Sequence, residues 1–183
     1  MGALAGLDQL AQVREQVERL TSEAKIVAGG GDVALLSADA SRGAFMAPTL
    51  LRCDDAMGAQ LVHEVEAFGP VATLLPYDNL AEAGTLARRG KGSLVMSLFS
   101  NDQTVVSEIL MEAASSHGRI LIVDRDSAAD STGHGSPLPH LVHGGPGRAG
   151  GGEEMGGLIG MKHYMQRSAV QAAPAVLDRI AEL

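Results

Sequence analysis

The sequence predicts an α/β fold in which a twisted, parallel-rich sheet is flanked by helices. Three observations predict it. The chain has 183 residues, and at roughly 100 to 200 residues per domain this length fits one domain with appendages. Hydrophobic residues make up 45% of the chain, enough to bury a core. In the middle of the chain, short apolar runs alternate with helical patterns, which is typical of strands joined by parallel crossovers.

The first third predicts one helix and two strands. From Leu7 to Glu23, apolar residues recur at spacings of three and four, the pattern of an amphipathic helix. Lys25 to Ala28 predicts a short strand, and Gly29 to Gly31 after it favours a turn over a binding loop. Phe45 to Arg52 predicts a second strand. Pro48 restricts its pairing to an edge or an irregular end, because proline lacks an N–H.

The middle third predicts the parallel sheet. Gln60 to Glu66 favours a helical turn or a short connector, which ends at Gly69 and Pro70. Beyond it we expect right-handed parallel crossovers. The predicted strands are Val71 to Tyr77, Leu94 to Ser100 and Ile120 to Val123, and we expect the first of them to be buried. Two helices separate the strands. The first is capped by Asn79 and runs through Arg89, and the second is capped by Asp102 and runs through Ser116.

The last third begins with a long loop from Asp124 to Gly152, rich in Gly, Pro, Ser and His. A loop of that length inside a compact domain is usually functional or disordered. After it we expect a short helix over Glu153 to Gly160, an exposed or partner-facing strand over His163 to Gln171, and a closing helix over Ala173 to Leu183.

Charge and composition exclude several classes of function. The net charge is −8 and no basic cluster with interleaved aromatics is present, so we expect no nucleic-acid partner. The longest apolar stretches are far short of the roughly 18 residues that a bilayer span needs, and no signal segment opens the chain. We therefore expect a cytoplasmic protein with no membrane partner. With Cys53 as the only cysteine, no internal disulfide or multi-cysteine metal site forms.

Two glycine-rich motifs fall in the late loop. Gly145, Gly147 and Gly150 satisfy the dinucleotide-binding pattern GxGxxG, but prolines rather than a strand precede them, and more glycines rather than a long helix follow. His143 with Gly144 and Gly145 is similar to the HGG oxyanion loop of esterases, yet the chain has no GxSxG nucleophile elbow. Both chemistries are therefore disfavoured.

Other chemistry-bearing side chains favour structural roles. His63, Glu64 and Glu66 suggest metal ligands, but alternation along the chain separates His63 from Glu64 and no complementary ligand pair stands elsewhere. A solvated acidic face is favoured, and no metal is expected. The acids that follow Cys53 disfavour a thiolate, which favours a small structural residue over a nucleophile.

A family resemblance begins at Glu66 to Val71. This segment, EAFGPV, resembles the EIFGPV segment of the aldehyde dehydrogenase superfamily, and Ala47 to Leu50 resembles the PT strand that precedes it there. Leu98 to Asp102 and Arg119 to Asp124 look like the family's next strand, helix and strand. At the start of the chain, Met1 to Leu4 resembles the family's MGPL, which lies after the nucleophilic cysteine.

The late loop extends the resemblance over essentially the whole chain. His143 to Gly156 is similar to the family's FGGxKxSGxGRExG, from which it departs at His143, Gly147, Ala149 and Glu153. Ser131 to Arg167 looks like the branch that oxidises ring-cleavage CoA semialdehydes, including the dehydrogenase domain of the phenylacetate-pathway bifunctional protein and the benzoyl-CoA-pathway semialdehyde dehydrogenase. The resemblance implies oxidation of an aldehyde, expected to be a CoA-linked semialdehyde from aromatic catabolism, to the acid with NADP or NAD; the branch favours NADP.

The resemblance also implies which parts of the family's enzymes this chain contains. Residues 1–162 match the C-terminal part of the catalytic domain, and residues 163–183 match an oligomerisation strand and a closing helix. In the family the Rossmann cofactor domain, catalytic Cys, general-base Glu and oxyanion-hole Asn all precede the matching point. We therefore expect no catalytic residue in this chain and no turnover by the chain alone.

Five residues carry over to binding roles through the resemblance. Glu66 matches the carboxylate that accepts hydrogen bonds from the nicotinamide ribose diol, and Phe68 matches the aromatic beside the nicotinamide ring. Gly135, Pro137 and His143 fall where the family's loop lines the aldehyde entrance, and histidine in place of phenylalanine suits a larger, acylated substrate.

The resemblance further implies a homo-oligomer, because His163 to Gln171 matches the strand that joins a neighbouring subunit's sheet. Two alternatives stay open. In the first, the chain is a non-catalytic oligomerisation module. In the second, it is a nucleotide-binding module that uses the glycine loop.

Overall fold

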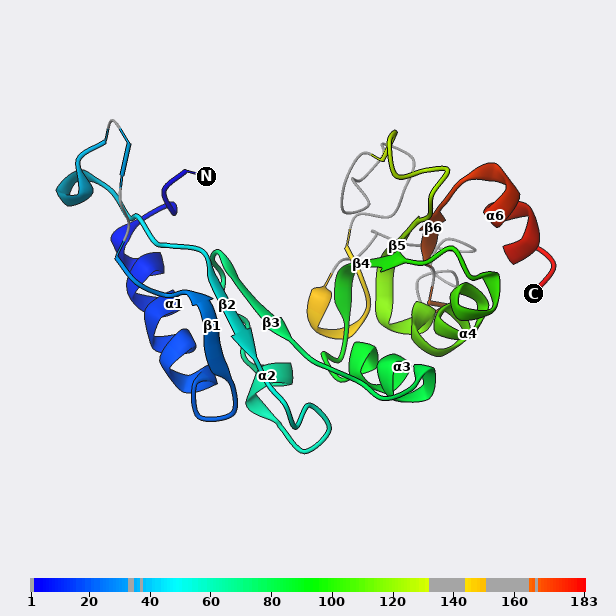
Figure 1. Ribbon diagram of the computed structural model, residues 1–183, viewed down its shortest axis with the longest axis horizontal. Helices are drawn as coiled ribbons and strands as arrows, with labels where there is room; N and C mark the ends of the chain where they lie inside the picture. Colours follow the sequence, from blue (N-terminus) through cyan, green and yellow to red (C-terminus); the bar gives the residue numbers. More distant parts are fainter. Residues whose placement is uncertain (1, 33–34, 37, 132–143, 151–164, 167) are drawn as a thin grey trace. The chain divides into compact units, whose positions relative to one another are not determined.

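The computed structural model describes residues 2–32, 35–36, 38–131, 144–150, 165–166 and 168–183. It divides the chain into two compact units, Met1–Tyr77 and Asp78–Leu183, each of which has its own sheet (Figure 1). The α/β class and the parallel sheet with flanking helices are confirmed. The division after residue 162 stays a prediction. No helix in the described part of the chain combines the length and the apolar character needed to cross a membrane.

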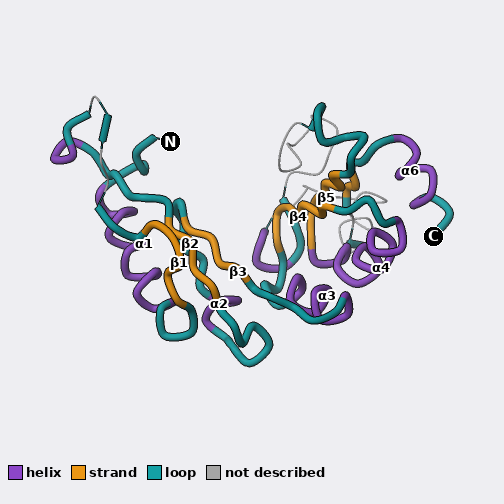
Figure 2. The backbone as a smooth tube through the Cα atoms, viewed as in Figure 1, coloured by secondary structure: helices purple, strands orange, loops and turns teal. Residues whose placement is uncertain are grey.

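The first unit has a three-stranded mixed sheet in the order β1-β2-β3 (Figure 2). Strand β1 is antiparallel to β2, and β2 is parallel to β3. The predicted first helix and first strand are both present. The elements are α1 (Leu7–Leu20), β1 (Lys25–Gly29), the 3-10 turn η1 (Ala40–Arg42), β2 (Thr49–Arg52), α2 (Leu61–Glu64) and β3 (Val71–Leu74).

The core of this unit lies between the end of α1, the central strand and the segment around α2. Leu51 on β2 is fully buried, and Leu20 from α1 packs in the same cluster. Burial of such side chains contributes about 1.5–3 kcal/mol each. The cluster comprises Leu20, Ala24, Leu51, Cys53 and Ala59, with Val62, Val65, Ala67, Val71 and Leu75 packed against it.

The second strand starts later than the pattern predicts. It begins at Thr49, directly after Pro48, and lies at the centre of its sheet, so the irregular end rather than the edge is correct. Gly29 ends β1 with φ +72°, and a Cβ there would lie 1.6 Å from the carbonyl oxygen of Pro48. Glycine is therefore required where the two strands meet, at the last residue of β1, and the turn over Gly29 to Gly31 stays a prediction.

The prediction of a buried strand over Val71 to Tyr77 is wrong in two respects. In β3 the side chains alternate, so that Val71 and Thr73 are half-buried while Ala72 and Leu74 are exposed. The strand also pairs with β2 and belongs to a different sheet from β4, so no crossover within one sheet joins them. The chain passes from one compact unit to the next at Tyr77.

The second unit has a fully parallel sheet in the order β4-β5-β6. Both predicted caps are present: Asn79 accepts the N–H of Glu82 at 3.0 Å, and Asp102 accepts that of Thr104 at 2.8 Å. The elements are α3 (Leu80–Arg88), β4 (Ser93–Phe99), α4 (Gln103–Ala113), η2 (Ala114–Ser116), β5 (His117–Val123), η3 (Gly147–Ala149), β6 (Ala169–Gln171) and α6 (Pro174–Ile180).

One face of this sheet is covered by α4 and α6. Ile120 and Ile122 of β5 are buried against Val106 and Leu110 of α4 and Val176 of α6. Strand β5 starts at His117, three residues before the predicted start at Ile120. The apolar pattern missed this part of the strand because it includes two buried polar residues, His117 and Arg119.

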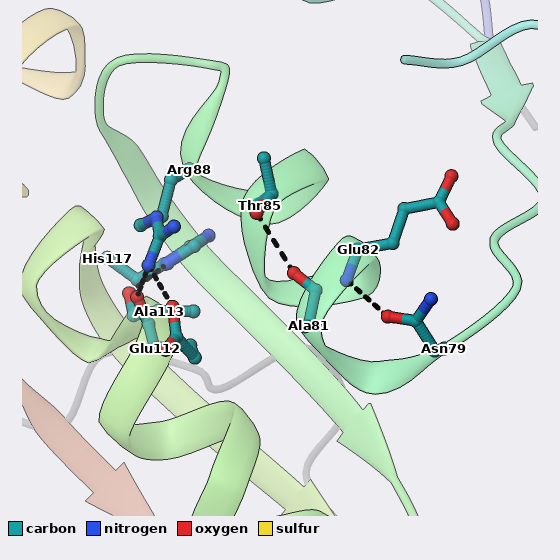
Figure 3. A network of polar contacts seen from close by, with 8 residues as sticks. All are labelled: Asn79, Ala81, Glu82, Thr85, Arg88, Glu112, Ala113 and His117. Atoms are coloured by element: carbon teal, nitrogen blue, oxygen red, sulfur yellow. Dashed lines mark hydrogen bonds and ion pairs between the residues drawn. The ribbon is translucent and has the colours of Figure 1, made fainter.

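Helices α3 and α4 pack closely at Gly84, where a Cβ would lie 2.8 Å from the Cβ of Glu112. Figure 3 shows the polar contacts around this crossing. Arg88 donates to the backbone oxygen of Glu112 at 3.0 Å and forms an ion pair with its carboxylate. His117 Nδ1 lies 2.8 Å from the carbonyl oxygen of Ala113 and ties the start of β5 to the end of α4.

Candidate functional site

The segment between α2 and β3 presents two side chains to solvent. Val65 and Ala67 pack against the core, whereas Glu66 and Phe68 are exposed. Exposure thus alternates along this segment, and Glu66 and Phe68 are its two solvent-facing side chains. Phe68 is 71% exposed, and among the described residues Glu66 forms no hydrogen bond or ion pair. A carboxylate and an aromatic ring are therefore both open to a ligand.

The backbone that carries these side chains is held by tight turns. The N–H of Gly69 donates to the carbonyl of Ala67 at 2.7 Å, and the N–H of Val71 donates to that of Gly69 at 2.8 Å. Each bond closes a three-residue turn, in which the central residue is Phe68 in the first and Pro70 in the second. The exposed aromatic thus stands on a constrained backbone.

Helix α1 braces the same segment. Gln9 Nε2 donates to the carbonyl oxygen of Phe68 at 2.7 Å, and Gln9 Oε1 accepts the N–H of Ala5 at 3.0 Å. Val13 is fully buried, and a Cβ on Gly69 would lie 2.9 Å from both of its methyl carbons. The EAFGPV segment approaches α1 this closely because Gly69 has no side chain.

A second brace comes from just beyond α1. Glu23 accepts the N–H groups of Gln60 and Val62, each at 3.1 Å, and so caps the first turn of α2. Partial desolvation pushes the pKa of this carboxyl upward. The N–H groups of Gln60, Val62 and Leu61 and the charge of His63 outweigh that effect and hold the pKa below its ordinary value. The carboxylate is therefore ionised at neutral pH.

The structure places the other acidic-stretch residues in structural contacts. His63 Nε2 lies 2.8 Å from the carbonyl oxygen of Ala56, and Glu64 accepts from the Gln60 side chain at 3.1 Å. In the described ranges, no three His, Cys, Asp or Glu side chains gather as a metal site would require. Both residues lie in the one-turn helix α2 rather than in the alternating segment.

Cys53 lies in the core of the first unit and is almost fully buried. Burial raises the pKa of its thiol, and Glu23, Asp55 and Asp54 raise it further, against one backbone hydrogen bond that lowers it. A thiol in this environment is a poor nucleophile. The interpretation of Cys53 as a structural residue agrees with this position.

The glycine loop packs against the amino ends of β4 and β5. A Cβ on Gly145 would lie 2.5 Å from the Ser93 carbonyl oxygen, and one on Gly147 would lie 2.1 Å from that of Lys91. Within the motif, Gly147–Ala149 forms the 3-10 turn η3. A dinucleotide cradle lies at the carboxyl end of a strand, whereas these glycines pack against the amino ends of strands, so the described contacts favour a role in protein packing.

The predicted entrance residues Gly135, Pro137 and His143 lie outside the described residues, as does the helix expected over Glu153 to Gly160. Gln9, Val13 and Glu23 are supporting residues that the sequence reasoning missed. The apolar stripe of α1 indicates that Val13 is buried but carries no information about what covers it, and Gln9 and Glu23 are polar residues of common types.

Comparison with known proteins identifies relatives over nearly the whole chain. The sequence model of the Aldehyde dehydrogenase family matches residues 1–170. The chain is 51% identical over 182 residues to Protein MaoC of Klebsiella aerogenes, and 44% identical over 147 residues to a 3,4-dehydroadipyl-CoA semialdehyde dehydrogenase of Aromatoleum evansii. These alignments take in 100% and 80% of this chain, but 53% and 28% of those proteins. The chain thus spans about half, or less, of the length of these relatives.

Solved structures share the fold. A betaine aldehyde dehydrogenase variant from Staphylococcus aureus in complex with NAD+ matches 90% of this chain and 30% of its own, with a TM-score of 0.68 and 24% identity. A succinic semialdehyde dehydrogenase from Streptococcus pyogenes in complex with NADP+ matches 82% of this chain and 29% of its own, with a TM-score of 0.60 and 20% identity. At these identities the likeness concerns the fold alone.

Proposed function

The chain belongs to the aldehyde dehydrogenase family, and from that membership we propose that its first unit forms the nicotinamide-ribose side of an NAD(P)-binding site. Glu66 accepts hydrogen bonds from the two ribose hydroxyls, and the ring of Phe68 packs beside the nicotinamide. The observation that carries the proposal is the exposure of both side chains, two residues apart, on a segment that Gln9 holds by a hydrogen bond.

The residues present fit the chemistry of that group. Two neighbouring hydroxyls are donors that need a paired acceptor, and an exposed carboxylate has two acceptor oxygens. A flat nicotinamide ring needs an apolar surface, which the exposed Phe68 ring offers. When bound, the nicotinamide supplies the hydride acceptor of an oxidation. This chain's own residues hold and orient it.

Both NADP and NAD meet these requirements, because the nicotinamide ribose is the same in the two cofactors. The solved relatives named above were crystallised with one or the other. We propose NADP as the preferred cofactor on the resemblance to the CoA-semialdehyde branch. Glu66 and Phe68 do not discriminate between the two.

For the substrate we propose a CoA-linked semialdehyde from aromatic catabolism, oxidised to the acid. The 44% identity to the 3,4-dehydroadipyl-CoA semialdehyde dehydrogenase supports this class. Gly135, Pro137 and His143 would line the aldehyde entrance. The isolated chain is proposed to be inactive, since no residue of it is assigned the roles of nucleophile or general base.

The last part of the proposal concerns how subunits assemble and where in the cell the protein is found. We place a subunit contact at His163 to Gln171, and the outer position of β6 in its sheet supports this, since added strands join sheets at outer strands. A non-catalytic oligomerisation module is the alternative that this position favours. Residues 163–183 would act as the assembly element and residues 1–162 as the partial catalytic domain. The lone free cysteine and the acidic composition support a cytoplasmic location.

The test is a titration of the chain with reduced nicotinamide riboside, an uncharged ligand that carries both the ring and the diol. We expect Glu66→Gln to weaken binding about tenfold or more, because the diol loses a charged acceptor. Glu15→Gln, which changes an exposed glutamate on α1, is the matched control. Phe68→Ala is compared with Phe99→Ala, since both rings are 71% exposed. Equal binding by all four variants would overturn the proposal.

A further inference from the structure

We propose that Gln9 is a positioning residue for the nicotinamide site, because it fixes the Phe68 carbonyl and thereby the aromatic ring. The inference rests on the proposed function and deepens it. Gln9 and Phe68 are 59 residues apart in sequence and 2.7 Å apart between amide nitrogen and carbonyl oxygen. Gln9 does not need to touch the ligand to act in this way.

A hydrogen bond from another element matters at Phe68 because packing of the Phe68 side chain does little to fix its backbone. The ring is 71% exposed and is not among the residues of the core cluster. Its neighbours Ala67 and Gly69 are held by core packing and by Val13, respectively. The bond from Gln9 fixes the peptide group between those two points. A ring on a fixed backbone loses less freedom when a ligand binds, which favours binding.

The chemistry of glutamine suits both bonds that the side chain makes. The N–H of Ala5 only donates and the carbonyl of Phe68 only accepts, so the amide must present its oxygen to Ala5 and its nitrogen to Phe68. The first bond secures the start of α1, where the N-cap residue, Gly6, offers no side chain. The second reaches out of the helix to the EAFGPV segment.

Two substitutions separate the two bonds. Gln9→Glu keeps an acceptor for Ala5 but has no donor for Phe68. Gln9→Lys keeps a donor of sufficient length for Phe68 but has no acceptor for Ala5. A carboxylate in the first turn also interacts favourably with the helix dipole, whereas an ammonium does not. The two variants are therefore expected to affect stability and ligand binding in opposite ways.

The experiment measures both quantities on the full chain. Thermal unfolding gives stability, and a titration with uncharged reduced nicotinamide riboside gives binding. We expect Gln9→Glu to unfold near the wild-type temperature yet to bind about threefold to tenfold more weakly. We expect Gln9→Lys to unfold at a lower temperature yet to bind within about twofold of the wild type. A purely structural role would make binding follow stability instead.

A second measurement keeps the inference testable apart from the cofactor proposal. The backbone order parameter of the Gly69 amide, measured by NMR without ligand, reports whether the Phe68 peptide is fixed. It should fall in Gln9→Glu and stay near the wild-type value in Gln9→Lys. An unchanged order parameter in Gln9→Glu, or equal loss of binding in both variants, overturns the positioning role. If the wild type binds no riboside while the order parameters follow this pattern, Gln9 fixes Phe68 and the proposed cofactor site is what fails.

Discussion

Both carboxylate oxygens of Glu23 lie 3.1 Å from the backbone nitrogen of Gln60, 37 residues further along the chain. This contact joins the end of α1 to the start of α2, the short helix that precedes Glu66. Together with the bond from Gln9 to Phe68, it makes α1 and the residues after it the support of the candidate site.

The first prediction concerns the pH dependence of that contact. Folding lowers the pKa of Glu23, so the carboxylate stabilises the folded chain at neutral pH, and this stabilisation is lost as the pH falls below the ordinary carboxyl pKa. We expect Glu23→Gln to be less stable than the wild type near neutral pH, and the difference to shrink at about pH 4. Urea unfolding at the two pH values, with Glu15→Gln as the control, checks this. A difference that grows in acid would contradict it.

The second prediction concerns the close approach of Gly69 to Val13. Gly69→Ala places a methyl group 2.9 Å from both methyl carbons of a fully buried, branched side chain, so we expect a loss of about 1–3 kcal/mol in unfolding free energy. Val13→Ala should cost about 2 kcal/mol or more through its cavity. In the double variant each change relieves the other, and we expect a cost about 1 kcal/mol below the sum. Strict additivity would show that the two residues do not touch.

The third prediction tests the role of the glycine loop. At Gly92, φ is +122° and a Cβ would lie 1.9 Å from the Pro146 carbonyl oxygen, so Gly92→Ala should destabilise the second unit by at least about 2 kcal/mol. Gly90→Ala is the matched control, because its Cβ would meet nothing closer than the Ser93 hydroxyl at 3.7 Å. We expect that variant to stay within about 0.5 kcal/mol of the wild type. Equal effects on unfolding would remove the packing explanation for the motif.

The fourth prediction is the absence of turnover. Cys53 is buried and its thiol pKa is raised, so the purified chain should not reduce NAD or NADP with any aldehyde, CoA-linked semialdehydes included. Absorbance of the reduced cofactor measures this, and a longer family member that is active on the same aldehyde serves as the positive control. Turnover that disappears in Cys53→Ser would identify that residue as the nucleophile and reverse its assignment.

Local features of the fold were accessible from the sequence. The caps at Asn79 and Asp102 follow from side-chain chemistry within two or three residues, and the stripe of α1 follows from its period. The sheet assignment of β3 was not accessible in this way. A strand of four residues with half-exposed alternation fits several partners, and its neighbour is decided by packing far along the chain.

The candidate site likewise has residues that the sequence indicates and residues that only the structure reveals. Glu66 and Phe68 stand in a recognisable segment, but their exposure beside the half-buried Val65 and Ala67 becomes visible only in the structure. Gln9 and Glu23 act across 59 and 37 residues, through single hydrogen bonds to backbone groups. No sequence pattern specifies such a bond, because any polar side chain at the right place in space makes it.

The most direct test of a nicotinamide riboside site at Glu66 and Phe68 is to locate that ligand by NMR. Intermolecular nuclear Overhauser effects between bound reduced nicotinamide riboside and the chain report proximity atom by atom. We predict contacts from the ligand's ring protons to the Phe68 ring and from its ribose protons to the side chain of Glu66. Contacts to Gly145, Gly147 and Gly150, with none to Phe68, would contradict a site at Glu66 and Phe68.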